Sequence, residues 1–254
     1  MYTLVVATLL LSCSQDPVPI PEPIKKLRKM SWGPQDYRAY EYNNKGLLAV
    51  ATTQWQDGSG NINTVTHHIE YDGNRLTKTT NNAGYLLYTY KNELPEKAEA
   101  YLLNGRKLST LSFKFDQHKK LEYVTELMAE PAGPEETKVN YSYYTKGNVK
   151  RMDFYLRLQP SEPFSLNFSK EFEGYDNKKN AEPDEVLGNF IHEIKLTINN
   201  PLKIVNRDAS GNIMGHIRYE YTYNSAGYPE QKKQFVTLQD VEQLPITYRY
   251  QYEN

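Results

Sequence analysis

Pairs of aromatic residues separated by one other residue recur along most of the 254-residue chain, and a short polar turn and an alternating stretch follow each pair. Side chains two apart on a strand point to the same face, so each copy predicts a strand, a turn and a second strand. With the second aromatic as marker, most copies lie between 19 (Tyr71 to Tyr90) and 29 residues (Tyr42 to Tyr71) apart, which fits one hairpin per unit. The markers are Tyr42, Tyr71, Tyr90, Phe115, Tyr143, Tyr223 and Tyr252.

The turn residues agree with a chain of hairpins. Asn104-Gly105 lies between two alternating stretches, and this pair favours a tight turn because both residues tolerate positive φ. Helical periodicity is confined to residues 183–191, where an early proline and first-turn acids predict one short helix. We therefore expect an all-β fold: a twisted antiparallel sheet built as a meander of β-hairpin repeats, single-layered or partly closed, with at most one short helix near 183–191.

Tyrosine supplies much of the apolar area that such a sheet needs. The chain has 22 Tyr beside 8 Phe and 2 Trp, and a tyrosine ring can be buried while its hydroxyl stays wet. The formal net charge is −1, so charge repulsion does not keep the chain unfolded as it does in highly charged disordered segments. There is no long basic run, so nucleic acid is not an expected partner. One short basic cluster, residues 25–29, indicates a solvated linker or a contact with lipid headgroups or a partner.

The amino terminus has the pattern of an export signal. Residues 4–11 form a mainly apolar run that is far shorter than the about 20 residues needed to span a bilayer, and it fits a signal-peptide core. Leu10-Leu11-Ser12-Cys13 then resembles the lipobox of bacterial lipoproteins, in which the cysteine is lipidated and becomes the first mature residue. Cys13 is the only cysteine, so it has no intramolecular disulfide partner. Met1 and Tyr2 carry no positive charge, which departs from the usual signal pattern.

The residues after Cys13 favour an extended tether. Prolines at 17, 19, 21 and 23 disfavour the alternative of a buried amino-terminal strand and favour a polyproline II spacer. We therefore divide the chain into a lipoprotein signal peptide (1–12), a lipidated Cys13 with a Pro-rich tether (13–30), and a β-hairpin repeat domain (31–254).

Two sequence motifs resemble those of known proteins. Residues 71–76 (Tyr-Asp-Gly-Asn-Arg-Leu) are similar to the Tyr-Asp repeats of bacterial Rhs-type wall and toxin proteins. Residues 175–180 (Tyr-Asp-Asn-Lys-Lys-Asn), followed by 199–201 (Asn-Asn-Pro), resemble a pairing in Bacteroidota lipoproteins of unassigned function, whose first motif usually ends Asn-Pro. The resemblance implies a lipid-anchored outer-membrane location, facing the periplasm or the cell surface, and no particular activity.

Few residues suggest chemistry. His67 and His68 are adjacent, so on a strand they point to opposite faces and cannot share a metal ion. Motifs for a nucleophile elbow, a zinc protease, a phosphate loop or an EF-hand are absent, so we predict no catalytic residue, no metal site and no cofactor. Trp32 and Trp55 are candidates for stacking on a sugar or a peptide side chain, against the alternative that both are core residues.

These observations favour a non-enzymatic, membrane-anchored envelope lipoprotein that acts as a binding or assembly module. Its partner would be a glycan, a peptide or another envelope protein, because sheet repeats offer broad surfaces and unpaired edge strands. Two alternatives stay open: a carbohydrate hydrolase that uses two of the 31 acidic residues as a carboxylate pair, and a purely structural spacer.

The first prediction concerns the anchor. Cys13→Ala should move the protein from the membrane fraction to the soluble fraction, because it removes the only residue that can carry the lipid. The measurement is fractionation followed by immunoblotting, with Ser14→Ala as the matched control. Unchanged membrane partitioning of the Cys13 variant would contradict the anchor.

Overall fold

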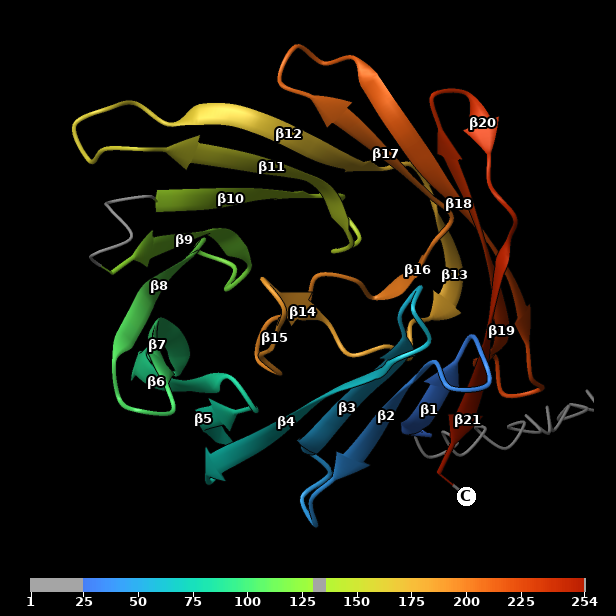
Figure 1. The fold of residues 1–254 in the computed structure, drawn as a ribbon, viewed down its shortest axis with the longest axis horizontal. Coiled ribbons are helices and arrows are strands. Elements are labelled where there is room, and N and C mark those ends of the chain that lie inside the picture. The colour runs from blue at the N-terminus through green and yellow to red at the C-terminus, as the bar shows by residue number, and fades with distance from the viewer. Residues whose placement is uncertain (1–24, 130–135, 254) are drawn as a thin grey trace, which may run out of the picture.

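The computed structural model describes residues 25–129 and 136–253, which form a chain of strands joined by short turns (Figure 1). In chain order the strands are β1 (Leu27–Ser31), β2 (Tyr37–Tyr42), β3 (Leu48–Gln56), β4 (Ile62–Asp72), β5 (Arg75–Thr80), β6 (Gly84–Lys91), β7 (Leu94–Leu102), β8 (Lys107–Phe115), β9 (Leu121–Met128), β10 (Glu136–Tyr143), β11 (Val149–Arg157), β12 (Ser165–Phe172), β13 (Tyr175–Lys179), β14 (Glu185–Val186), β15 (Asn189–Phe190), β16 (Asn199–Pro201), β17 (Lys203–Asp208), β18 (Ile213–Tyr223), β19 (Pro229–Leu238), β20 (Val241–Glu242) and β21 (Ile246–Tyr252).

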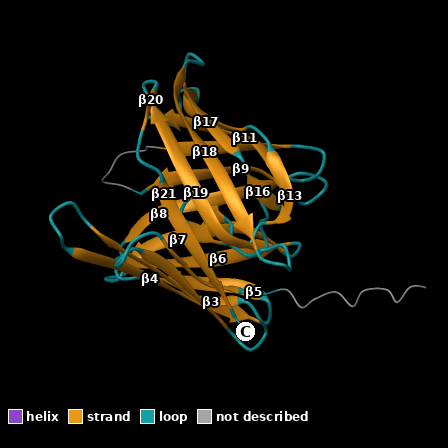
Figure 2. Ribbon diagram, turned by 90° about the vertical axis from the view of Figure 1, so that its right-hand side faces the viewer, coloured by secondary structure: helices purple, strands orange, loops and turns teal. Residues whose placement is uncertain are grey.

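The main sheet closes into a barrel. Strands β1 to β12 pair in sequence, β12 pairs with β17, and β17, β18, β19 and β21 continue the ring, all antiparallel. Strand β21 then pairs with β1, where Tyr250 lies opposite Met30, so 16 strands form a closed wall. Figure 2 shows these strands crossing the barrel obliquely, as closure requires. The all-β, antiparallel prediction is confirmed, and the expectation of an open or partly closed sheet is wrong.

Two further expectations are corrected. Residues 183–191 form no helix, because Leu187 and Gly188 have positive φ and place β14 and β15 in a small hairpin. Strand β1 begins at Leu27, so residues 27–30, which the sequence assigned to the tether, belong to the wall. The signal peptide and Cys13 lie outside the described residues. No helix in the described ranges is long and apolar enough to cross a membrane.

Tyrosine hydroxyl groups tie neighbouring strands together at one end of the barrel. Each of five tyrosines at or just beyond the end of a wall strand donates a hydrogen bond to the main-chain oxygen of the first residue of another wall strand. The pairs are Tyr42 to Leu27 (3.1 Å), Tyr71 to Leu48 (2.9 Å), Tyr143 to Leu121 (2.9 Å), Tyr175 to Val149 (2.7 Å) and Tyr252 to Pro229 (2.7 Å). We call these five residues the tie tyrosines.

The marker aromatics of the sequence pattern share a second feature. A shift in strand register comes directly before the marker in six of the seven copies, at positions 42, 71, 90, 115, 143 and 223. Such bulges bend and twist a strand at a barrel rim.

The turn at Asn104-Gly105 differs from the expected one, because only Gly105 has positive φ and the main-chain hydrogen bond that closes the loop runs from Leu102 to Arg106. The hairpin was predicted correctly, but its turn is longer than the two-residue turn expected.

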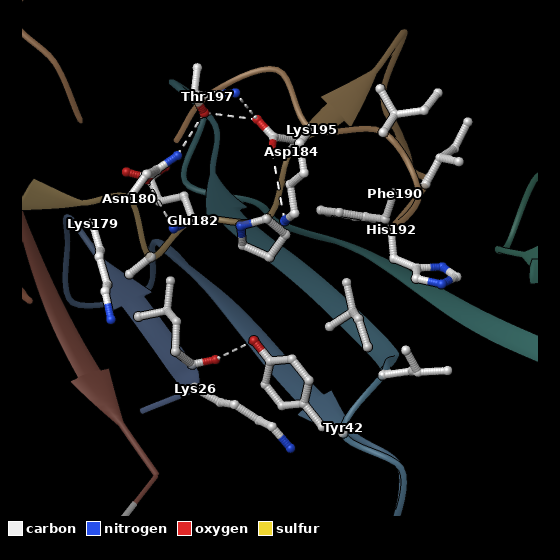
Figure 3. Close-up of a pocket in the computed structure, with 18 of the residues that line it drawn as sticks. Lys26, Tyr42, Lys179, Asn180, Glu182, Asp184, Phe190, His192, Lys195 and Thr197 are labelled. Atoms are coloured by element: carbon white, nitrogen blue, oxygen red, sulfur yellow. Dashed lines mark hydrogen bonds and ion pairs between the residues drawn. The ribbon is translucent and has the colours of Figure 1, made fainter. Parts of the chain in front are cut away.

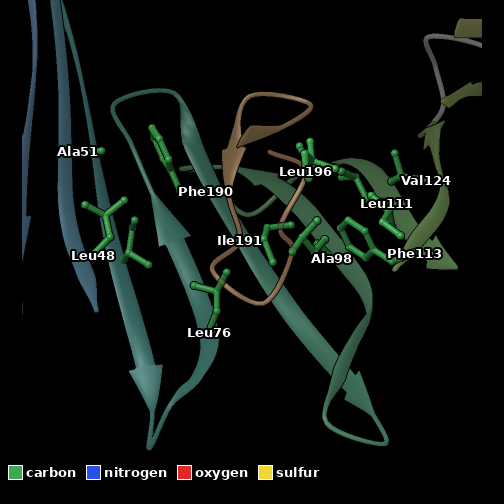
Figure 4. Close-up of a cluster of buried hydrophobic side chains, with 14 of the residues drawn as sticks. Leu48, Ala51, Leu76, Ala98, Leu111, Phe113, Val124, Phe190, Ile191 and Leu196 are labelled. Atoms are coloured by element: carbon green, nitrogen blue, oxygen red, sulfur yellow. The ribbon is translucent and has the colours of Figure 1, made fainter. Parts of the chain in front are cut away.

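The barrel has its hydrophobic side inside. Buried wall residues such as Leu76, Ala98 and Val124 share one core with Phe190 and Ile191, which lie on a segment within the barrel (Figure 4). Full burial of a large apolar side chain contributes about 1.5–3 kcal/mol. The wall is therefore held from within as well as by its ladder of strands.

The outer side of the wall is charged. Residues next to each buried strand position point outward, and many of them form ion pairs between or along strands. These pairs are Glu70–Lys78, Glu99–Lys107, Glu136–Arg157, Arg151–Glu171, Arg207–Glu171 and Arg218–Glu220. A lipid-facing wall instead carries an apolar band about 25 Å tall, where a central Lys or Arg costs about 2–4 kcal/mol. The outer wall also exposes large apolar side chains, among them Leu87 and Leu127, so its charged positions alternate with apolar ones.

The second prediction compares two tyrosines on β10. Tyr143→Phe should lower the free energy of unfolding by about 0.5–1.5 kcal/mol, because it removes the hydroxyl that binds the Leu121 carbonyl. Tyr141→Phe should be neutral or stabilising, because the buried Tyr141 hydroxyl has no hydrogen-bond partner among the described residues. Urea unfolding of both variants measures the difference, and equal losses would show that the ring alone matters.

Candidate functional site

The interior of the barrel is occupied by residues 173–202, which connect β12 to β17 and contain β13 to β16 (Figure 1). We call this segment the plug. Its apolar side chains pack into the core of the barrel. Val186, Phe190, Ile191, Ile194 and Leu196 are all buried. The plug therefore fills much of the space that 16 strands enclose, which side chains of the wall alone do not fill.

Acidic residues of the plug bind basic residues and tyrosines of the wall. Glu182 accepts hydrogen bonds from Lys232 Nζ (2.6 Å) and the Tyr250 hydroxyl (2.6 Å). Glu185 pairs with Arg38 at 2.5 Å. Lys232 has only 10% of its side chain exposed, so loss of its partner would leave a buried charge. These contacts fix the plug in one position against β2, β19 and β21.

The two sequence motifs, residues 175–180 and 199–201, lie side by side in the plug. Asp176 on β13 accepts hydrogen bonds from the main-chain N–H of Asn200 (3.1 Å) and from its side-chain amide (3.0 Å). The Tyr223 hydroxyl also donates to Asp176. Strands β13 and β16 pair beside this contact. Residues 175–180 and 199–201 are therefore structural neighbours that close the plug on itself.

Burial and partners shift the acids of the plug in opposite directions. Burial is the largest effect and would raise the pKa of Glu182, but the charges of Lys232 and Arg38 and the hydrogen bonds from Lys232 and Tyr250 together lower it. Burial raises the pKa of Asp184, and the attraction of Lys195 only partly opposes it. Burial would also raise the pKa of Glu193, yet hydrogen bonds from His192 and Tyr90 lower it. Burial also raises the pKa of Glu185, although the charge of Arg38 opposes it. The plug thus combines two carboxylates that resist protonation with two that resist ionisation.

A cavity of about 510 Å³ lies between the plug and the wall at the end where the described chain begins (Figure 3). Its surface is mostly apolar, with Leu48 from the wall and Ile191 and Ile194 from the plug. Figure 3 shows Tyr42, Phe190 and His192 around the same space. This volume and lining are typical of a site for a small molecule.

Lysines surround the mouth of this cavity. Lys25 and Lys26 come directly before β1, whereas Lys179 and Lys195 belong to the plug. Figure 3 labels Lys26, Lys179 and Lys195. Lys195 lies 3.9 Å from Asp184. Among the described residues, the other three form no ion pair with a carboxylate; Lys26 instead lies over the Tyr42 ring at 5.1 Å. The mouth therefore carries uncompensated positive charge.

The candidates from the sequence lie elsewhere. Trp32 is partly buried against Tyr248, with ring centroids 5.6 Å apart, and Trp55 is 38% exposed at the opposite end of the barrel. Neither lines the cavity, so a stacking role for either stays a prediction. Within residues 25–129 and 136–253 no three His, Cys, Asp or Glu side chains form a group that could hold a metal ion.

Sequence reasoning missed the plug and its cavity. One signal was available: the markers Tyr143 and Tyr223 are much farther apart than any other neighbouring pair. The structure places one more hairpin, closed by Tyr175, and the whole plug in that interval. A break of this kind in a regular repeat indicates an insertion with its own role.

Two solved structures share this fold over nearly their whole length. One is described as a porin-like protein from Bacteroides uniformis, with a TM-score of 0.58 and 16% identity, covering 89% of this chain and 98% of that chain. The other is described as a porin-like protein from Bacteroides vulgatus, with a TM-score of 0.59 and 11% identity, covering 90% and 99%. At these identities the similarity shows the fold alone. No family model and no curated protein matches the chain.

The third prediction tests how the plug is held. Lys232→Met should destabilise the protein by about 1–3 kcal/mol, because Glu182, whose side chain is only 26% exposed, loses its cation. Adding Glu182→Gln should recover most of the loss. The pKa of Glu182 is lowered in wild type, whereas burial would raise it in the variant, which lacks Lys232. The gap in stability should therefore be largest at neutral pH, begin to shrink above about pH 4.3 as the variant protonates Glu182, and shrink further as pH falls through the lowered pKa of wild type.

Denaturant unfolding at several pH values measures this cycle. Lys233→Met is the matched control, because Lys233 is exposed on the outer side of the same strand and should change stability by no more than about 0.5 kcal/mol. Equal effects at the two positions would show that the contact between Lys232 and Glu182 does not hold the plug.

Proposed function

We propose that the chain is a lipid-anchored envelope protein whose plugged barrel stands in water and binds its partner at the plug end. The observation that carries this proposal is the polarity of the barrel, with an apolar, filled interior and ion pairs along its outer wall. Among the described residues the interior is apolar and filled, where a pore needs an open polar lumen, and the outer wall carries ion pairs beside its exposed apolar side chains. The barrel instead provides a rigid frame for the cavity beside the plug.

The location rests on two independent features. The lipobox at residues 10–13 supports an anchor on Cys13, and the barrel fold shared with porin-like Bacteroides proteins supports an outer-membrane setting in Bacteroidota. The Tyr-Asp repeat resemblance fits the same group of lipoproteins. We propose that the membrane holds the protein through its lipid and not through its strands.

A carbohydrate hydrolase is the second candidate, because Glu182 and Asp184 line the same cavity and have opposite pKa shifts. Their contacts favour binding over catalysis. Glu182 is held by Lys232 and Tyr250, and Asp184 has only 6% of its side chain exposed and accepts hydrogen bonds from Thr197. A general acid must reach the oxygen it protonates, and Asp184 is enclosed. A purely structural spacer would not require the cavity.

The fourth prediction tests where the wall lies. Thr110→Cys places a thiol on the outer side of β8, and Leu111→Cys places one on the inner side, where Leu111 is 2% exposed. In membrane fragments open on both faces, a polar maleimide should label Thr110→Cys as fast as it does in detergent. It should label Leu111→Cys only after unfolding. The acylated Cys13 has no free thiol to interfere.

Protection of Thr110→Cys in membrane fragments, with labelling in detergent, would place the wall inside the bilayer and reject the proposal. Unfolded control samples establish that each new thiol is reactive. The comparison uses neighbouring residues on one strand, so it does not depend on the overall stability of the barrel.

A further inference from the structure

We propose that the cavity at the plug end binds a single-chain amphipathic phosphate, with the acyl chain inside the cavity and the phosphate at the lysines of the mouth. This inference rests on the proposed binding function and names its ligand class. The cavity of about 510 Å³ lies within the usual range for ligand sites of about 300–1,000 Å³. Leu48, Phe190, Ile191 and Ile194 give it an apolar surface that suits an acyl chain.

Several polar groups of the cavity already have protein partners, which disfavours a sugar, although Asp184 Oδ2 accepts no hydrogen bond from the described residues. The Tyr42 and Tyr71 hydroxyls donate to main-chain oxygens of Leu27 and Leu48. The Asn180 amide donates to Thr197, and the Thr197 hydroxyl donates to Asp184. A sugar would leave its own hydroxyls without partners in such a site, which is costly. An acyl chain needs none.

The lysines give the site its preference for an anion. Lys26, directly before β1, and Lys179, on the plug, both line the cavity, and each lies over a tyrosine ring, Tyr42 at 5.1 Å and Tyr228 at 6.0 Å. Among the described residues neither forms an ion pair with a carboxylate. A phosphate at either ammonium group would gain a charge-assisted hydrogen bond without breaking an existing pair.

The position of the mouth fits a ligand that comes from a membrane. Lys25 lines the cavity and lies 12 positions after Cys13 in the sequence, a reach of at most about 40 Å. An anchor on Cys13 would hold the mouth near anionic headgroups, which attract lysines.

The fifth prediction is a binding measurement on the full chain with Cys13→Ala, purified without detergent. Calorimetric titration with lysophosphatidic acid, below its micelle concentration, should give saturable binding with one site. Monoacylglycerol with the same chain should bind about five- to tenfold more weakly, because it lacks the charge. Inorganic phosphate alone should not bind at comparable concentration, which separates a lipid headgroup from free phosphate as the source of the anion.

Variants locate the site. Ile198→Trp adds bulk at the mouth on an exposed residue that lines the cavity, and it should abolish binding of both lipids. Lys26→Gln/Lys179→Gln should remove the preference for lysophosphatidic acid over monoacylglycerol. The matched control, Lys114→Gln/Lys146→Gln, removes two lysines outside the cavity and should bind like wild type. Thermal unfolding of each variant confirms that the barrel is intact.

Equal binding of the charged and neutral lipids to wild type would overturn the proposal, as would inorganic phosphate that displaces the lipid completely. Absence of lipid binding would reject the ligand class while leaving the labelling result for Thr110→Cys, and so the proposed function, unaffected. Binding that survives Ile198→Trp in a folded barrel would place the lipid elsewhere and reject this site.

Discussion

The barrel depends on hydrogen bonds from tyrosine hydroxyls to main-chain carbonyls at one of its ends. Each tie tyrosine joins the end of one strand to the start of a neighbour, including Tyr42, whose hydroxyl binds Leu27 at the start of β1 beside the closing strand β21. Each ring is half-buried while its hydroxyl satisfies a backbone oxygen, so one side chain contributes both packing and a hydrogen bond. A chain poor in large aliphatic residues can close a wide ring in this way.

A wide ring creates the need that the plug fills. Sixteen strands enclose more space than wall side chains occupy, and an empty apolar interior would lose the contacts that stabilise a core. The plug supplies apolar side chains for the core and also acceptors for wall tyrosines: Tyr90 donates to Glu193, and Tyr250 donates to Glu182. Where the plug lies, carboxylates therefore take the role that main-chain carbonyls have for the tie tyrosines.

The sequence predicted what local chemistry determines. The spacing of Tyr42, Tyr71 and Tyr143 identified strand ends, because alternation and turn residues act over a few positions. Closure depends on pairing Met30 with Tyr250, far apart in the chain, and no local pattern reports it. The helix expected at residues 183–191 failed for the same reason: contacts of the plug with the wall override the local propensity. The lysines of the cavity could not be grouped without the fold.

Side-chain polarity, and not strand topology, decides what such a barrel can do. The porin-like Bacteroides structures share its topology, yet a fold does not carry a function with it. Here Arg151, Glu171 and Arg207 form an ion-pair network on the outer wall, while Phe172, next to Glu171, is buried inside. Exchanging the two faces would require a one-residue shift of every strand, which the bulges and tie tyrosines prevent. The repeat therefore fixes which face of each strand points into the barrel.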